Sequence, residues 1–274
     1  MRAKVISLLI LTAILFGCAK TAVKNAENSF IGKEPIIVDH TCTDIERIPE
    51  IWIEKTKKTF NISYGHTSHG SQIISGMRAL QTKNGILSFS SNTSSRHLTI
   101  FDREPKGDLG NPDRQTWYQR TKDLLDHGWG DTNIILWSWC GQVSNATKED
   151  IDTYLELMDA LEKEYPKVIF IYMTGHLDGS GARGNLNIRN TQIRGFCRNN
   201  NKILYDFADI ESYDPDGNSF LNLNANDRCD YKKEGQRRNW ADEWCKANPG
   251  ECSDYRCAHS MPLNCDMKAR AFWW

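Results

Sequence analysis

A strand-to-helix turn carrying histidine and serine is the part of this sequence best suited to chemistry. Residues 60–74 begin as a short β-prone run, pass through Gly-His-Thr-Ser-His-Gly at 65–70 and continue with apolar residues at helical spacing. Such a turn lifts a hydroxyl off the end of a sheet, and the helix directs backbone N–H groups at an anion beside it. Ser68 is therefore predicted to be a nucleophile, with Ser71 as its rival. Either serine could instead only cap the helix.

A serine nucleophile needs a base, and the sequence offers two candidates. His259, in Cys-Ala-His-Ser near the C-terminus, is the first choice, and Asp254, five positions earlier, could orient it. His176, in Thr-Gly-His-Leu-Asp-Gly, is the second choice because it also follows an apolar run. The alternative for His259 is a histidine held only by the packing of a disulfide-bonded loop.

A metal-dependent hydrolase is an alternative that uses the same loops. Four side chains at the predicted strand ends could hold zinc with an activated water: His66, His69, His176 and Asp178. A turn gives the two histidines at 66 and 69 no fixed common face, so their spacing is not diagnostic. The primary prediction includes no metal and no organic cofactor.

Alternating strand-like and helix-like segments indicate how these loops are positioned. Continuous apolar runs of strand length lie at residues 133–139, 168–173 and 202–207. Helical spacing recurs at residues 71–82, 148–165 and 191–199. Fully apolar strands separated by helices are typical of a parallel sheet covered on both faces. We therefore expect an α/β fold, a three-layer α/β/α sandwich with a mainly parallel, flavodoxin-like sheet.

The segments after the predicted strands favour one edge of that sheet as the site. They are polar and contain glycine or acidic residues, and they occupy positions 65–70, 140–144, 174–179 and 208–211. Ligands of open α/β sheets bind beyond the carboxyl ends of the strands. The candidate residues are therefore expected to meet at this edge.

In the order and context of these residues, the chain resembles the SGNH (GDSL-like) hydrolase superfamily from residue 61 onward. The resemblance implies that Ser68 is the nucleophile and that His259, just before a final helix, is the base. It also implies that Gly141 and Gln142, after an apolar strand, contribute to the oxyanion hole. The first block reads Gly-His-Thr-Ser rather than Gly-Asp-Ser, and no Asp stands three residues before the base.

The first residues predict export. A short basic start is followed by an apolar run and by Leu-Phe-Gly-Cys, which resembles the lipobox of bacterial lipoproteins. We expect a signal peptide at 1–17, lipidation of Cys18, a polar tether at 18–33 and one domain at 34–274. An ordinary secretory signal is the alternative, and both export the protein. The lipoprotein would be membrane-anchored at the periplasmic face or cell surface.

Cysteine usage agrees with export. Of the nine cysteines, eight remain after Cys18, and an even set in an oxidising compartment favours disulfides. Most of them crowd into a Cys-rich C-terminal segment, 229–265. Their spacing there does not match the short paired spacing of structural zinc sites.

Composition narrows the partners. The chain has 34 basic and 35 acidic residues and no basic stripe, so we expect no nucleic acid partner. Nine Trp favour contact with sugar rings, although core packing is the alternative use. The sequence predicts an exported serine-dependent ester hydrolase that removes O-acyl groups, such as acetyl, from a polysaccharide through an acyl-enzyme. The alternative from another class is a non-catalytic glycan-binding lipoprotein.

Overall fold

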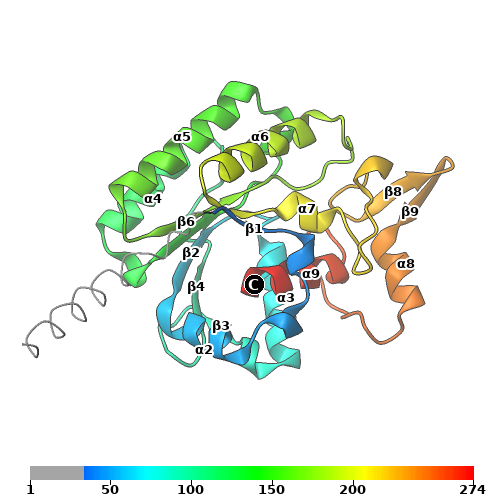
Figure 1. Cartoon of the computed structure of the whole chain (residues 1–274), viewed down its shortest axis with the longest axis horizontal. Coiled ribbons are helices and arrows are strands. Elements are labelled where there is room, and N and C mark those ends of the chain that lie inside the picture. Colours follow the sequence, from blue (N-terminus) through cyan, green and yellow to red (C-terminus); the bar gives the residue numbers. More distant parts are fainter. Residues whose placement is uncertain (1–33) are drawn as a thin grey trace, which may run out of the picture. The chain divides into compact units, whose positions relative to one another are not determined.

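Seven parallel strands form the central sheet of the computed structural model, which describes residues 34–274 (Figure 1). The order across the sheet is β1-β7-β6-β5-β2-β4-β3, and every pairing is parallel. The strands are β1 Ile36–Val38, β2 Asn61–Gly65, β3 Phe89–Ser90, β4 Leu98–Asp102, β5 Ile134–Trp137, β6 Ile169–Met173 and β7 Ile203–Tyr205.

The predicted signal peptide 1–17, the lipidation site Cys18 and the tether 18–33 lie outside the described residues. Among residues 34–274, no helix combines the length and hydropathy that a membrane span requires.

Helices cover both faces of the sheet. One face packs against α2 Glu50–Thr59, α3 Ser71–Lys83 and α9 Pro262–Trp273. The other packs against α4 Thr116–Asp126, α5 Lys148–Glu164 and α6 Asn185–Asn199. These two groups lie on opposite sides of the strands in Figure 1. The protein is therefore a three-layer α/β/α sandwich, and the predicted fold class is confirmed.

Strand β5 illustrates why the apolar runs are continuous. Ile134 and Leu136 belong to the core under α3 and α9, whereas Ile135 and Trp137 belong to the core under α4, α5 and α6. Successive side chains of a strand point to opposite faces, so a strand covered on both faces must be apolar at every position.

The strand order places the site. β2 and β5 are neighbours, but β4 and β3 lie on the far side of β2, whereas β6 and β7 lie on the far side of β5. The connections therefore diverge between β2 and β5, and ligands of open α/β sheets bind beyond the carboxyl ends of two such strands.

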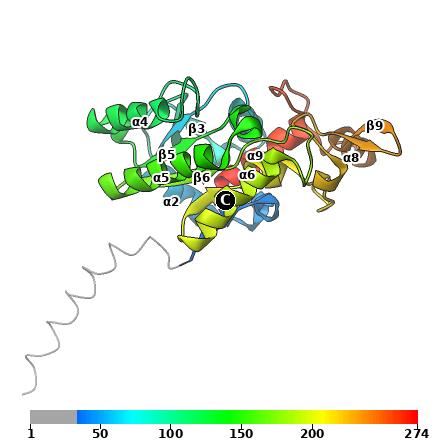
Figure 2. The ribbon, with the colours of Figure 1, turned by 90° about the horizontal axis from the view of Figure 1, so that it is seen from above.

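The C-terminal part forms a lobe beside this edge. It contains the antiparallel hairpin of β8 Asp230–Lys233 and β9 Gln236–Asn239, and then α8 Trp240–Ala247; the three lie together at one end of the domain (Figure 2). α7, Phe207–Glu211, precedes it. Two disulfides, Cys245–Cys252 and Cys257–Cys265, confirm the disulfide prediction for this segment. The other described cysteines are free: Cys42, Cys140, Cys197 and Cys229.

Candidate functional site

The turn after β2 and the loop after β5 bring His69 and Cys140 together. Nδ1 of His69 lies 3.2 Å from Sγ of Cys140. Both residues extend past the paired strand ends, where Gly65 is in register with Trp137. His69 is buried and Cys140 is half-buried, so the thiol remains accessible while its partner is shielded from water.

Asp227 completes the arrangement from the lobe. Its Oδ2 lies 3.1 Å from Nε2 of His69, on the side of the ring away from Cys140. The backbone N–H of Asp227 donates to the carbonyl of Leu177 over 3.1 Å, which fixes the carboxylate against the loop after β6. A nucleophile, a base within hydrogen-bond reach and a third group that orients the base is the general pattern of nucleophilic catalysis.

The electrostatics of this trio favour a thiolate–imidazolium pair. The hydrogen bond from His69 is the main cause that lowers the pKa of Cys140 to about 7, against the opposing effect of burial. Burial alone would lower the pKa of His69, but hydrogen bonds to Asp227 and Cys140 raise it to about 9. Burial would raise the pKa of Asp227, and the hydrogen bond from His69 nevertheless holds it below its usual range. An ionised thiol is the reactive form of cysteine.

The ring of His69 lies in a stack of three imidazoles. His176 is parallel to it at a centroid distance of 3.6 Å, and His259 is parallel at 4.5 Å. If the rings of His176 and His259 lay on the same face of His69 at these distances, they would overlap. The His69 ring therefore lies between the other two. Burial lowers the pKa of both flanking histidines, and so does the positive charge of His69. The flanking rings are therefore neutral beside a charged centre.

Gln142 holds the loop that carries the thiol. Its Oε1 accepts from the backbone N–H of Cys140 at 3.0 Å, and its Nε2 donates to Oδ2 of Asp108 at 2.7 Å. The side-chain N–H group that was predicted to stabilise an oxyanion therefore already donates to Asp108. The backbone N–H groups of Gly141, Ser68 and His69 make no hydrogen bond within residues 34–274. These three donors lie in the two segments that carry His69 and Cys140.

The predicted serine pair is arranged differently from expectation. Oγ of Ser68 lies 3.7 Å from Sγ of Cys140, and no hydrogen bond among the described residues joins it to His259. Ser71 donates to the carbonyl of Ser68 over 2.6 Å, which is a local turn contact. Asp254 is exposed and makes no hydrogen bond to His259 within the described part of the chain. The structure thus brings Ser68 and His259 to the same site, each beside a member of the trio, and leaves Asp254 outside it.

The predicted metal set does not assemble. Both ring nitrogens of His66 face acceptors, with Nε2 2.7 Å from Asp102 and Nδ1 2.7 Å from the carbonyl of Thr67. This pairing holds the turn that carries His69. Asp178 accepts instead from the hydroxyl and N–H of Ser180. A different group, His69, Asp227 and His259, has donor atoms within 4.8 Å of one another.

Sequence reasoning missed Cys140 and Asp227. Cys140 directly follows the apolar strand and precedes Gly141, which is the same context that singled out Ser68, but it was counted among the disulfide cysteines. Asp227 lies in a loop without a recognisable pattern and 158 positions from His69, so no local signal marks it. In comparisons with known proteins, no family model matches the chain, and neither a curated protein nor a solved structure matches it.

Proposed function

We propose that the protein is a cysteine-dependent hydrolase of carboxylic esters. The observation that carries the proposal is the continuous contact from Cys140 through His69 to Asp227 at the carboxyl edge of the sheet. The reaction class predicted from the sequence, ester hydrolysis through an acyl-enzyme, is retained, and the nucleophile is a thiolate in place of a serine.

The first half of the reaction acylates the enzyme. The sulfur of Cys140 attacks the ester carbonyl carbon, so that a C–S bond forms and the bond to the alcohol oxygen breaks. Free N–H groups at Gly141 and in the Ser68–His69 turn are the donors for the oxyanion. His69 gives its proton to the departing alcohol, while Asp227 keeps the ring oriented.

The second half releases the acid. Neutral His69 takes a proton from water as the water oxygen bonds to the acyl carbon and the C–S bond breaks. The thiolate and the imidazolium are thereby restored, and no oxidant or cofactor is consumed. The half-buried Asp227 stabilises the imidazolium in both the resting and the restored state.

A test with two probes separates the nucleophiles. The purified protein is treated with iodoacetamide in one sample and with a fluorophosphonate in another, and adducts are located by peptide mass spectrometry. Hydrolysis of 4-nitrophenyl acetate is followed for the wild type, Cys140→Ser and Ser68→Ala. We expect an alkylated Cys140, no fluorophosphonate adduct, and loss of hydrolysis in Cys140→Ser only.

The opposite pattern, a fluorophosphonate adduct on Ser68 with hydrolysis lost in Ser68→Ala, would overturn the thiol mechanism in favour of the serine one. If neither probe reacts and no ester is hydrolysed by the folded protein, the glycan-binding alternative gains weight. Export, anchoring through Cys18, similarity to SGNH hydrolases and an acylated glycan as substrate stay predictions of the sequence.

A metal-dependent hydrolase is a second candidate because the donor atoms of His69, Asp227 and His259 are close enough to share one ion. In that mechanism a metal-bound water replaces the thiolate as nucleophile. Dialysis against a chelator followed by addition of Zn²⁺ distinguishes the two. The thiol mechanism predicts full activity after chelation and inhibition by added Zn²⁺. The metal mechanism predicts that activity is lost on chelation and recovered when Zn²⁺ is added.

A further inference from the structure

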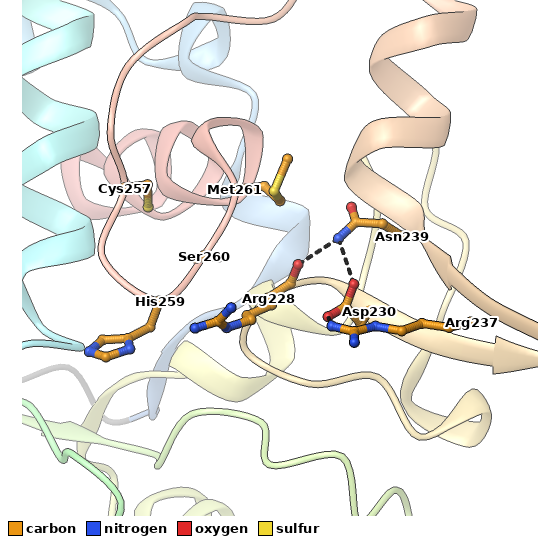
Figure 3. Close-up of a pocket in the computed structure, with 8 residues that line it drawn as sticks. All are labelled: Arg228, Asp230, Arg237, Asn239, Cys257, His259, Ser260 and Met261. Atoms are coloured by element: carbon orange, nitrogen blue, oxygen red, sulfur yellow. Dashed lines mark hydrogen bonds and ion pairs between the residues drawn. The ribbon is translucent and has the colours of Figure 1, made fainter.

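Two clefts open beside His259 at the rim of the candidate site. One of about 330 Å³ lies between the β8–β9 hairpin and the loop before α9, and Figure 3 shows its lining residues. The other, of about 450 Å³, lies on the α3 side of the same loop. Arg228 and His259 line both clefts, and Arg256 lines the second.

The charge in these clefts is positive and not neutralised. Arg228 and Arg256 are exposed, and neither forms an ion pair with an acidic side chain within residues 34–274. Arg237 also lines the first cleft, but it is paired with Asp230. In Figure 3 the guanidinium of Arg228 points toward the ring of His259. Two unpaired guanidinium groups therefore border the histidine that stacks on the catalytic base.

In the proposed mechanism the alcohol departs next to His69, and the clefts adjoin the histidine that stacks on His69. His259 lies against the ring of His69, the group that protonates the leaving oxygen. Arg228 directly follows Asp227, which holds the same ring. A substituent on the departing alcohol would therefore extend past His259 toward the arginines.

The loop that forms this rim is held in place. Gln72 donates from Nε2 to the carbonyl of Ala258 over 2.8 Å, and the Cys257–Cys265 disulfide ties the loop to α9. His259 has a φ of 57°, a left-handed conformation that costs a non-glycine residue free energy and that the surrounding contacts maintain. The His259 ring thus has a defined position relative to His69.

We infer that the two clefts form a subsite for an anionic group, and that the preferred substrates are esters whose leaving alcohol carries a carboxylate. Guanidinium groups recognise carboxylates through paired, charge-assisted hydrogen bonds. The inference rests on the proposed function and adds the substrate class to it.

The test uses three esters of comparable reactivity. 4-Nitrophenyl acetate has a neutral leaving group, 5-acetoxy-2-nitrobenzoate has a carboxylate on the leaving group, and mono-4-nitrophenyl adipate has it on the acyl group. The measured quantity is the ratio of kcat/KM for each anionic ester to that for the neutral ester. The proteins are the wild type, Arg228→Gln, Arg256→Gln, the double variant and, as a matched control, Lys232→Gln, which removes one exposed positive charge on β8 outside both clefts.

For the wild type we expect 5-acetoxy-2-nitrobenzoate to be preferred by about tenfold or more, as one or two charge-assisted hydrogen bonds would give. The ratio should fall toward one in the double variant and stay unchanged in Lys232→Gln. A ratio near one for 5-acetoxy-2-nitrobenzoate in the wild type, a preference for the adipate ester, or a ratio unaffected by the double substitution would overturn the inference while leaving the hydrolase intact. Failure to hydrolyse any of the three esters would instead refute the proposed function.

Discussion

Cys140 and His69 approach to 3.2 Å although they are 71 positions apart in the chain. The contact exists because β2 and β5 are adjacent and parallel, with Gly65 opposite Trp137. Both strands end at the same edge and the chain continues for a few residues beyond each, so the two side chains meet beyond the strand ends. The chemistry of the site depends on this pairing, because the hydrogen bond from His69 is the main cause of the low pKa of the thiol.

Alkylation of Cys140 by iodoacetamide should rise with pH through a midpoint of about 7, since that is the pKa to which His69 lowers the thiol. In His69→Ala the midpoint should shift toward the ordinary value for cysteine, because the principal cause of the lowering is gone. The rate is measured by mass spectrometry between pH 5 and about 10. Cys197 is an internal control, since burial raises its pKa to about 12 and it should stay unlabelled in the native protein. A midpoint that is the same in both proteins would contradict the ion pair.

Ester hydrolysis should follow a bell-shaped pH profile. Activity rises as Cys140 loses its proton near its pKa of about 7, and falls as His69 loses its proton near its pKa of about 9. In Asp227→Asn the hydrogen bond that raises the His69 pKa is weakened, so the alkaline limb should move to lower pH. The profile of kcat/KM for 4-nitrophenyl acetate checks this. An alkaline limb that does not move in the variant would show that Asp227 does not support the imidazolium.

His176 is predicted to be a positioning residue that acts through its stacking contact with His69. Replacement by Ala removes the stacked ring and should lower kcat/KM about two- to twelvefold, the range expected for a stacking energy of about 0.5–1.5 kcal/mol. Replacement by Phe keeps an aromatic ring there and should restore most of the activity. Steady-state kinetics are compared with thermal unfolding of each variant, so that a general loss of stability can be recognised. Equal losses in the two variants would point to a role for the His176 nitrogens instead.

Breaking the buried ion pair beneath the site should strongly destabilise the fold. Lys268 and Glu211 are both fully buried and lie 2.6 Å apart, and Glu211 also accepts from the backbone N–H of Leu177. Lys268→Met leaves a buried carboxylate without its counter-charge, so we expect a loss of about 3–5 kcal/mol in the free energy of unfolding.

Urea denaturation measures this loss, and the surface pair of Lys148 and Asp152 supplies the control. Lys148→Met should change the free energy of unfolding far less than Lys268→Met does, because exposed pairs in a helix are weak. The double variant Lys268→Met/Glu211→Leu should recover part of the stability, since it removes the unpaired charge as well. If it is no more stable than Lys268→Met, the cost does not arise from the stranded carboxylate.

The sequence by itself determined the α/β class and the edge at which the site lies. Strand β5 is apolar at all four positions and buried on both faces, as a covered parallel sheet requires. A continuous apolar run of this length can be recognised from the sequence alone. The same patterning located the loops after the strands, and hence His69, His176 and Ser68. It also indicated that the cysteines of the C-terminal segment form disulfides.

Only the tertiary structure decided which side chains act together. Cys140 and Cys257 are the same residue type, yet one is free beside an imidazole and the other is bonded to Cys265. Whether a thiol meets a second thiol or a histidine depends on strand order and loop geometry, which periodicity does not encode. Asp227 reaches His69 across 158 positions for the same reason, because its place is set by the packing of the C-terminal lobe against the sheet.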